Sequence, residues 1–242
     1  MRLRIFSDLH FEFHADNGAQ FVRSLHADPN EVLILAGDIA VGDGVSAAVA
    51  WFCAKWRQVL FVAGNHEYYH HRPADLDAIL TTCSRNHPNF HWLDNGTVTI
   101  DGQRFVGGSL WFDEDAGAHP ARRYLNDFNT IEDFEPWVYR QHAKTVALLR
   151  RELRPTDVVI THHLPAQCCV HPKWKLSVLN PFFVHDLEWL IRERQPKLWV
   201  HGHTHERVDA RIEATRIVAN PFGYKGLEEQ VAFEHNFVVE VN

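Results

Sequence analysis

The chain has 242 residues, of which 45% are hydrophobic, and a formal net charge of -7 at pH 7. A net negative charge argues against a protein that coats duplex nucleic acid, because such binding depends on neutralisation of phosphates by lysine and arginine. No apolar run approaches the roughly 18 residues of a membrane-spanning helix, and residues 1–6 lack the features of a signal peptide. We therefore expect one cytoplasmic α/β domain over residues 1–242, with its four cysteines reduced.

Short apolar runs alternate along the chain with segments of helical spacing. Strands are predicted, each directly before a polar block, at residues 3–6, 32–36, 59–62 and 158–161. Spacing and length predict helices over residues 46–56, 73–86, 135–153 and 184–194. Turn residues predict a β meander over residues 90–93, 97–100 and 104–107. Similar short strands separated by turns are predicted at residues 207–212, 215–219 and 232–241. The whole pattern therefore predicts two packed β-sheets flanked by helices.

Metal-binding residue types occur in five short blocks, which are Asp8-Leu9-His10, Gly37-Asp38, Gly64-Asn65-His66-Glu67, Thr161-His162-His163 and Gly202-His203-Thr204-His205. Their oxygen and imidazole groups are ligands that Mn, Fe, Zn or Ni accept, and no cysteine lies in any block. Since ligands in α/β layers gather at the carboxyl ends of strands, the blocks are expected to meet in the fold. Over nearly the whole chain, the blocks resemble the D-x-H, G-D, G-N-H-[ED], H and G-H-x-H pattern of the calcineurin-like metallophosphoesterases.

The resemblance implies a single metallophosphoesterase domain of two packed mixed sheets, with two divalent transition-metal ions that activate water for attack on a phosphate ester. The ligands that the family pattern implies are Asp8, His10 and His205 for the first ion, Asn65, His162 and His203 for the second, and Asp38 as the bridge. By the same resemblance, His66 faces the scissile phosphate and donates a hydrogen bond or a proton to the leaving-group oxygen. An acidic neighbour would fix its tautomer, and the sequence leaves Asp38 and Glu67 as alternatives.

The loops around the site are expected to select the substrate. The long connection after the meander is of a length that is usually functional or mobile. The candidate substrate-binding residues are Trp111, Asn126, Asp127 and His163. Arg122 and Arg123 are further candidates, for holding a remote phosphate, against the alternative of a solvated basic surface.

The expected function is hydrolysis of a phosphodiester or phosphomonoester bond in a small substrate, for which a nucleotide-derived ester is one candidate. A nuclease or a protein phosphatase is the alternative, and either needs an extended basic groove or a peptide-docking surface that the sequence does not indicate. The third class is a non-catalytic scaffold of the same fold, which has no need of His66 or a full ligand set. No membrane association and no dedicated nucleic-acid-binding domain are expected, and the oligomeric state stays open.

Overall fold

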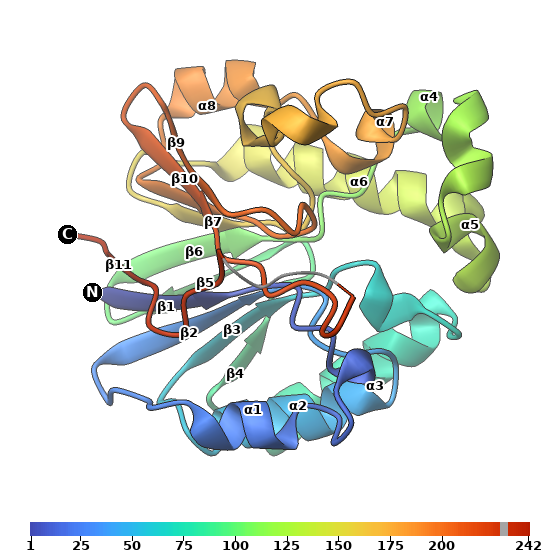
Figure 1. Ribbon diagram of the computed structural model, residues 1–242. Helices are drawn as coiled ribbons and strands as arrows, with labels where there is room; N and C mark the ends of the chain where they lie inside the picture. Colours follow the sequence, from blue (N-terminus) through green and yellow to red (C-terminus); the bar gives the residue numbers. More distant parts are fainter. Residues whose placement is uncertain (228–231) are drawn as a thin grey trace.

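Two β-sheets pack face to face in the computed structural model, which describes residues 1–227 and 232–242 (Figure 1). The first sheet has the order β11-β1-β2-β3-β4. Its four parallel strands are β1 (Arg2–Phe6), β2 (Glu31–Ala36), β3 (Val59–Val62) and β4 (Phe90–Trp92). The fifth strand, β11 (Val238–Glu240), pairs antiparallel with β1 at the edge.

The second sheet has the order β5-β6-β7-β8-β10-β9. Its parallel strands are β6 (Gln103–Gly107), β7 (Val158–Ile160), β8 (Leu198–Val200) and β10 (Thr215–Ala219). The antiparallel edge strands are β5 (Gly96–Ile100) and β9 (Val208–Ile212). The expected architecture of two mixed sheets is therefore confirmed.

Helices cover the outer face of each sheet (Figure 1). The first sheet is covered by α1 (Ala19–Ser24), α2 (Gly44–Cys53) and α3 (Pro73–Asn86). The second sheet is covered by α6 (Phe134–Glu152) and α8 (Glu188–Arg194). The shorter helices are α4 (Glu114–Gly117), α5 (Asp127–Thr130) and α7 (Asn180–Phe183), and short 3-10 helices lie at Phe11–Phe13, His66–Tyr68, Pro120–Tyr124, Gln167–Cys169 and Pro172–Trp174. No helix among the described residues is long and apolar enough to cross a membrane.

The apolar runs of the sequence follow from this layering. In β2, Ile34 packs into the core between the sheets, whereas Leu33 and Leu35 pack toward the helices. Strands covered on both faces need apolar side chains at every position, which explains a continuous run in place of an alternating one. The packed layers hold the carboxyl ends of the parallel strands in fixed positions.

Several predicted elements need correction. The meander is wrong because β4 pairs with β3 in the first sheet, while β5 and β6 form a hairpin in the second. Buried Leu93 marks the crossing between the sheets. The helix predicted from residue 184 begins at Glu188, and the strand predicted over residues 232–241 is restricted to Val238–Glu240. The short strand β8 was not predicted, although the block with His203 and His205 follows it.

Candidate metal centre

The five polar blocks meet at one end of the sandwich, because each follows a parallel strand. Three come from β1, β2 and β3 of the first sheet, and two come from β7 and β8 of the second. The backbone φ is positive at five candidate ligands, which are Asp8, His10, Asp38, His203 and His205. Left-handed backbone at residues other than glycine is uncommon and gathers at functional sites, where surrounding contacts hold it in place.

One cluster of candidate ligands consists of Asp8, His10 and His205. One possible ligand atom from each lies within 4.8 Å of the others. The two histidine Nε2 atoms are 3.0 Å apart, and His205 Nε2 is 3.7 Å from Asp8 Oδ1. The three groups therefore converge on a small common volume.

A second cluster consists of Asp38, His162 and His203, again within 4.8 Å of one another. His162 Nε2 lies 3.1 Å from His203 Nδ1 and 3.2 Å from the side-chain oxygen of Asn65. Asp38 Oδ2 is 3.4 Å from His162 Nε2 and 3.8 Å from His10 Nε2 in the first cluster. One carboxylate oxygen thus faces both clusters, which is the position required of a bridging ligand.

The chemistry of Asp8 and His203 fits bound cations. Asp8 Oδ2 is buried and has no hydrogen-bond partner among the described residues. This carboxylate oxygen therefore has a lone pair available for a cation. Burial, followed by the neighbouring His163 and His162, holds the pKa of His203 well below its usual value. Its imidazole is therefore neutral, the form that binds a metal.

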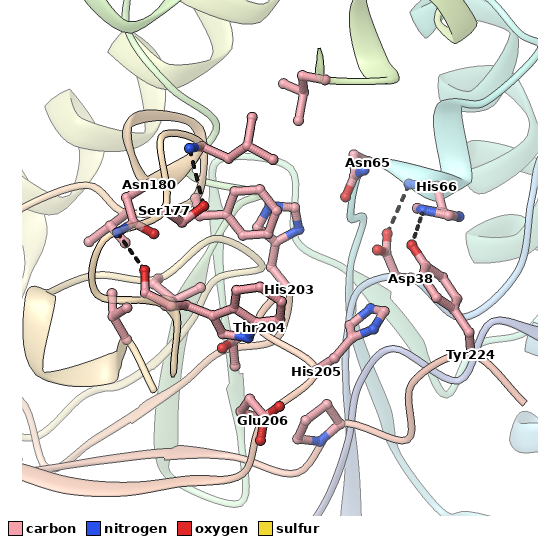
Figure 2. Close-up of a pocket in the computed structure, with 18 of the residues that line it drawn as sticks. Asp38, Asn65, His66, Ser177, Asn180, His203, Thr204, His205, Glu206 and Tyr224 are labelled. Carbon is pink, nitrogen blue, oxygen red and sulfur yellow. Dashed lines mark hydrogen bonds between the residues drawn. The ribbon is translucent and has the colours of Figure 1, made fainter. Parts of the chain in front are cut away.

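His66 lies beside the clusters and is held from three directions. Its backbone N–H donates to Asp38 Oδ1 at 2.9 Å, and its Nε2 lies 3.2 Å from the hydroxyl of Tyr224 (Figure 2). Its Nδ1 lies 2.9 Å from Glu12 Oε1, and the same oxygen lies 3.0 Å from Nδ1 of His10. The carboxylate that hydrogen-bonds to the His66 ring is therefore Glu12. Of the two alternatives considered from the sequence, Asp38 lies nearby but accepts only the backbone N–H of His66, and Glu67 has no hydrogen bond to the ring among the described residues.

Glu12 was missed because it lies outside the family motifs. Its only sequence signal is its position two residues after His10, in the short 3-10 helix that follows β1. Burial would raise the pKa of Glu12, but the hydrogen bonds with His10 and His66 lower it to about 2. Burial would likewise lower the pKa of His66, but Asp38 and Glu12 raise it. The pair therefore favours an ionised carboxylate next to a protonated imidazole.

Glu67 has a different task, which is to hold two ligand loops together. Its carboxylate is buried and accepts backbone N–H groups of Asp38 at 2.9 Å, Ile39 at 2.6 Å and Gly64 at 2.7 Å. These donors belong to the loops after β2 and β3. Glu67 thus fixes the relative positions of Asp38 and Asn65.

The predicted substrate residues divide into two pairs. Asn126 and Asp127 line the cavity next to the clusters, and Asp127 Oδ1 accepts from the Asn65 amide at 2.9 Å. Trp111 and His163 are buried and do not line this cavity. Their rings pack against each other with centroids 5.0 Å apart, so the structure places both behind the site.

The two arginines suggested for a remote phosphate also lie outside the cavity lining. Arg122 pairs with Glu135 and lies over the ring of Phe128 at 4.2 Å. Arg123 lies over the Tyr124 ring at 4.7 Å. Their placement fits the alternative of a solvated basic surface.

A cavity of about 610 Å³ opens beside both clusters. Figure 2 shows His203 and His205, one member of each cluster, among the residues that line it. Its lining includes Asp38, Asn65, His66, His203 and His205. A volume of this size accommodates a small organic ester, since typical ligand pockets span about 300–1,000 Å³.

The sequence model of the calcineurin-like phosphoesterase family matches residues 1–207, and the chain belongs to this family. Members of the family are phosphoesterases that generally bind divalent metals. A comparison with curated proteins gives no match.

Among solved structures, the phosphopantetheinyl hydrolase of Mycobacterium tuberculosis is similar, with a TM-score of 0.73 and 19% identity, over 92% of this chain and 89% of that one. The protein TT1561 of Thermus thermophilus is also similar, with a TM-score of 0.57 and 14% identity, over 91% of this chain and 88% of that one. At these identities the likeness shows the fold alone.

Proposed function

We propose that this protein is a hydrolase that uses two divalent transition-metal ions, Mn, Fe, Zn or Ni, to cleave the phosphodiester or phosphomonoester bond of a small substrate. The observation that carries the proposal is the shared oxygen of Asp38, which faces both ligand clusters while His66 lies beside them. Asp8, His10 and His205 would hold one ion, and Asn65, His162 and His203 the other, with Asp38 between them.

The bound ions would neutralise phosphoryl oxygens and lower the pKa of a water molecule, which supplies the nucleophile. The protein's own groups supply orientation and the proton. Glu12 accepts from Nδ1 of His66, which directs Nε2 toward the cavity. From the protonated ring, Nε2 donates a proton to the leaving-group oxygen. Asp127 accepts from the amide nitrogen of Asn65, which leaves the amide oxygen of Asn65 directed at the second cluster.

The charge of the cavity favours a small substrate over a nucleic acid. Lys173 is the only lysine or arginine among the described residues of the lining, and it pairs with Glu206. A long polyanion gains affinity by displacing counterions across many basic contacts, whereas a small ester needs only the metals and a few pocket groups. A non-catalytic scaffold would have no use for the oriented His66.

The four free cysteines fit a reducing compartment, and we propose a single-domain protein that acts in the cytoplasm.

The test is hydrolysis of bis(4-nitrophenyl) phosphate by protein that is stripped with a chelator and reloaded with Mn²⁺. A phosphopantetheinyl ester belongs in the same panel because of the similarly folded hydrolase. We expect turnover to require metal, to vanish in Asp38→Ala and to survive in Asp43→Ala, whose side chain is 93% exposed.

Salt distinguishes the nuclease alternative. Turnover of the small ester should change little between about 50 and 200 mM salt, whereas binding of a long nucleic acid falls steeply over that range. Absence of hydrolysis by the metal-loaded protein across the whole panel would contradict the proposal. Faster cleavage of long DNA or RNA, with a steep salt dependence, would support the nuclease instead.

A further inference from the structure

The cavity continues past the two clusters of candidate ligands into a part that we name the apolar arm. Its residues are Leu164, Val170, Trp174, Leu179, Phe183 and Val184. They come from the connection between β7 and α8. The arm begins directly at the site, because the ring of Phe183 packs on the ring of His203 with centroids 4.0 Å apart.

Polar residues near the arm use their hydrogen-bonding groups to hold its own loop. The Asn180 amide donates to the backbone oxygens of Trp174 at 3.0 Å and Lys175 at 3.3 Å. The Ser177 hydroxyl accepts from the backbone N–H of Leu179 at 3.2 Å. The pairing of Lys173 with Glu206 neutralises the cation of this region. The arm therefore offers apolar contact to a ligand and no cation for a second phosphate.

The arm and His66 lie on different sides of the clusters. Figure 2 shows Ser177 and Asn180 across the cavity from His66, with His203 and His205 between them. If His66 protonates the leaving group, the leaving group lies on the His66 side. A substituent in the arm is then a second one, which stays on phosphorus. A phosphomonoester has no second substituent, so an occupied arm requires a diester.

We propose that the substrate is a phosphodiester whose retained substituent is an uncharged, apolar alkyl or aryl group, bound in the apolar arm. The inference rests on the proposed function. In the reaction, a water molecule gives up one proton to solvent and its oxygen forms a bond to phosphorus, while the bond from phosphorus to the leaving oxygen breaks; solvent later returns a proton to His66. The leaving oxygen takes the electron pair of that bond and a proton from His66. The products are the free alcohol of the leaving group and the phosphomonoester of the apolar alcohol.

The test uses mixed diesters that share 4-nitrophenolate as leaving group and differ only in the retained group: methyl, hexyl, phenyl or thymidine-5'. A common leaving group keeps the demand for protonation constant. Full burial of one methylene corresponds to about fourfold in kcat/KM. With partial burial of the longer chain, we expect the hexyl and phenyl diesters to exceed the methyl diester by about 10- to 100-fold. They should also exceed the thymidine diester and 4-nitrophenyl phosphate.

Substitutions in the apolar arm test whether the preference for the hexyl over the methyl diester arises there. Leu179→Ala and Trp174→Ala should each lower the hexyl-to-methyl ratio of kcat/KM by about three- to tenfold, because they remove apolar contact. The matched control is Leu176→Ala, in the same loop. Leu176 is 96% exposed and does not line the cavity, so this variant should keep the ratio.

The outcomes separate this inference from the proposed function. Equal kcat/KM for the methyl and hexyl diesters, with hydrolysis dependent on metal, would overturn the inference and leave the function in place. A preference for the thymidine diester or for the monoester would overturn it in the same way. A ratio that is unchanged in both arm variants would show that the preference arises elsewhere. Failure of the metal-loaded protein to hydrolyse any ester would overturn the proposed function itself.

Discussion

Removal of the Glu12 carboxylate should weaken catalysis and metal binding by separate routes. Its Oε1 lies 2.9 Å from His66 Nδ1 and 3.0 Å from His10 Nδ1. A hydrogen bond to a charged group stabilises by about 1.5–3 kcal/mol, or roughly 10- to 100-fold. Because 23% of the Glu12 side chain is exposed, water replaces part of each bond, and we expect the lower end of that range. Glu12→Ala should thus lower kcat about tenfold through His66 and Mn²⁺ affinity about tenfold through His10.

The assay measures kcat at saturating Mn²⁺ for a diester with an alkyl alcohol as leaving group, which needs a proton to depart, and Mn²⁺ affinity separately by calorimetry. Glu12→Gln is the matched control, because it keeps an acceptor oxygen and should lose less of both. His66→Ala should keep both metals and lose about 10²–10⁴-fold in kcat, the usual scale for a proton donor, for a diester with a poor leaving group. The loss should shrink for bis(4-nitrophenyl) phosphate, because nitrophenolate needs little protonation. In the His66→Ala background, Glu12→Ala should lower only Mn²⁺ affinity. If the two losses in kcat multiply instead, Glu12 does not act through His66 and the reasoning is refuted.

Three further changes probe the ligand loops and the surface. Asp38→Ala should abolish binding of both ions, measured by metal analysis, and retention of two would contradict a bridging role. Glu67→Ala removes the acceptor of four buried N–H groups and should lower the free energy of unfolding by about 2–4 kcal/mol in urea denaturation. Burial and Asp94 raise the pKa of Asp77 to about 6, so its ionisation destabilises the fold as pH rises from about 4 to 6. Because Asp77 is only half-buried and solvent screens its charge, Asp77→Asn should stabilise by about 1–2 kcal/mol at pH 8, less than the full pKa shift implies, and not at pH 4; an equal effect at both would contradict this.

The sequence predicts the positions of the ligand blocks well because the governing rule is local. A short apolar run followed by Asp, Asn or His marks the carboxyl end of a strand, and parallel strands bring such ends together. Asp8, Asp38 and Asn65 follow β1, β2 and β3 in this way. Helix α3 is also predicted at its observed bounds, since Pro73 begins it and the buried Leu76, Leu80 and Cys83 give it helical spacing.

The features that the sequence does not predict depend on which segments pack together in three dimensions. The strands on either side of Leu93 are both short runs separated by turn residues, and only packing decides that β4 joins one sheet and β5 the other. An aromatic side chain in a loop, such as Trp111, suits a pocket and a core equally well by composition. Glu12 is a surface-type residue in sequence and acquires its role only because His10 and His66 converge on it.

The loops with the candidate ligands have left-handed backbone, and backbone hydrogen bonds hold them in this conformation. Positive φ at Asp8, His10, Asp38 and His203 is unfavourable for residues other than glycine, so other contacts must compensate. The N–H groups of Asp8 and His10 donate to the backbone oxygens of Gly37 and Asp38, each at 2.9 Å, and the N–H of His203 donates to Asp8 Oδ1 at 2.8 Å. These bonds connect the ends of β1, β2 and β8, which belong to both sheets. The packed sandwich therefore supplies the energy that keeps the candidate ligands convergent, and metal binding need not order them.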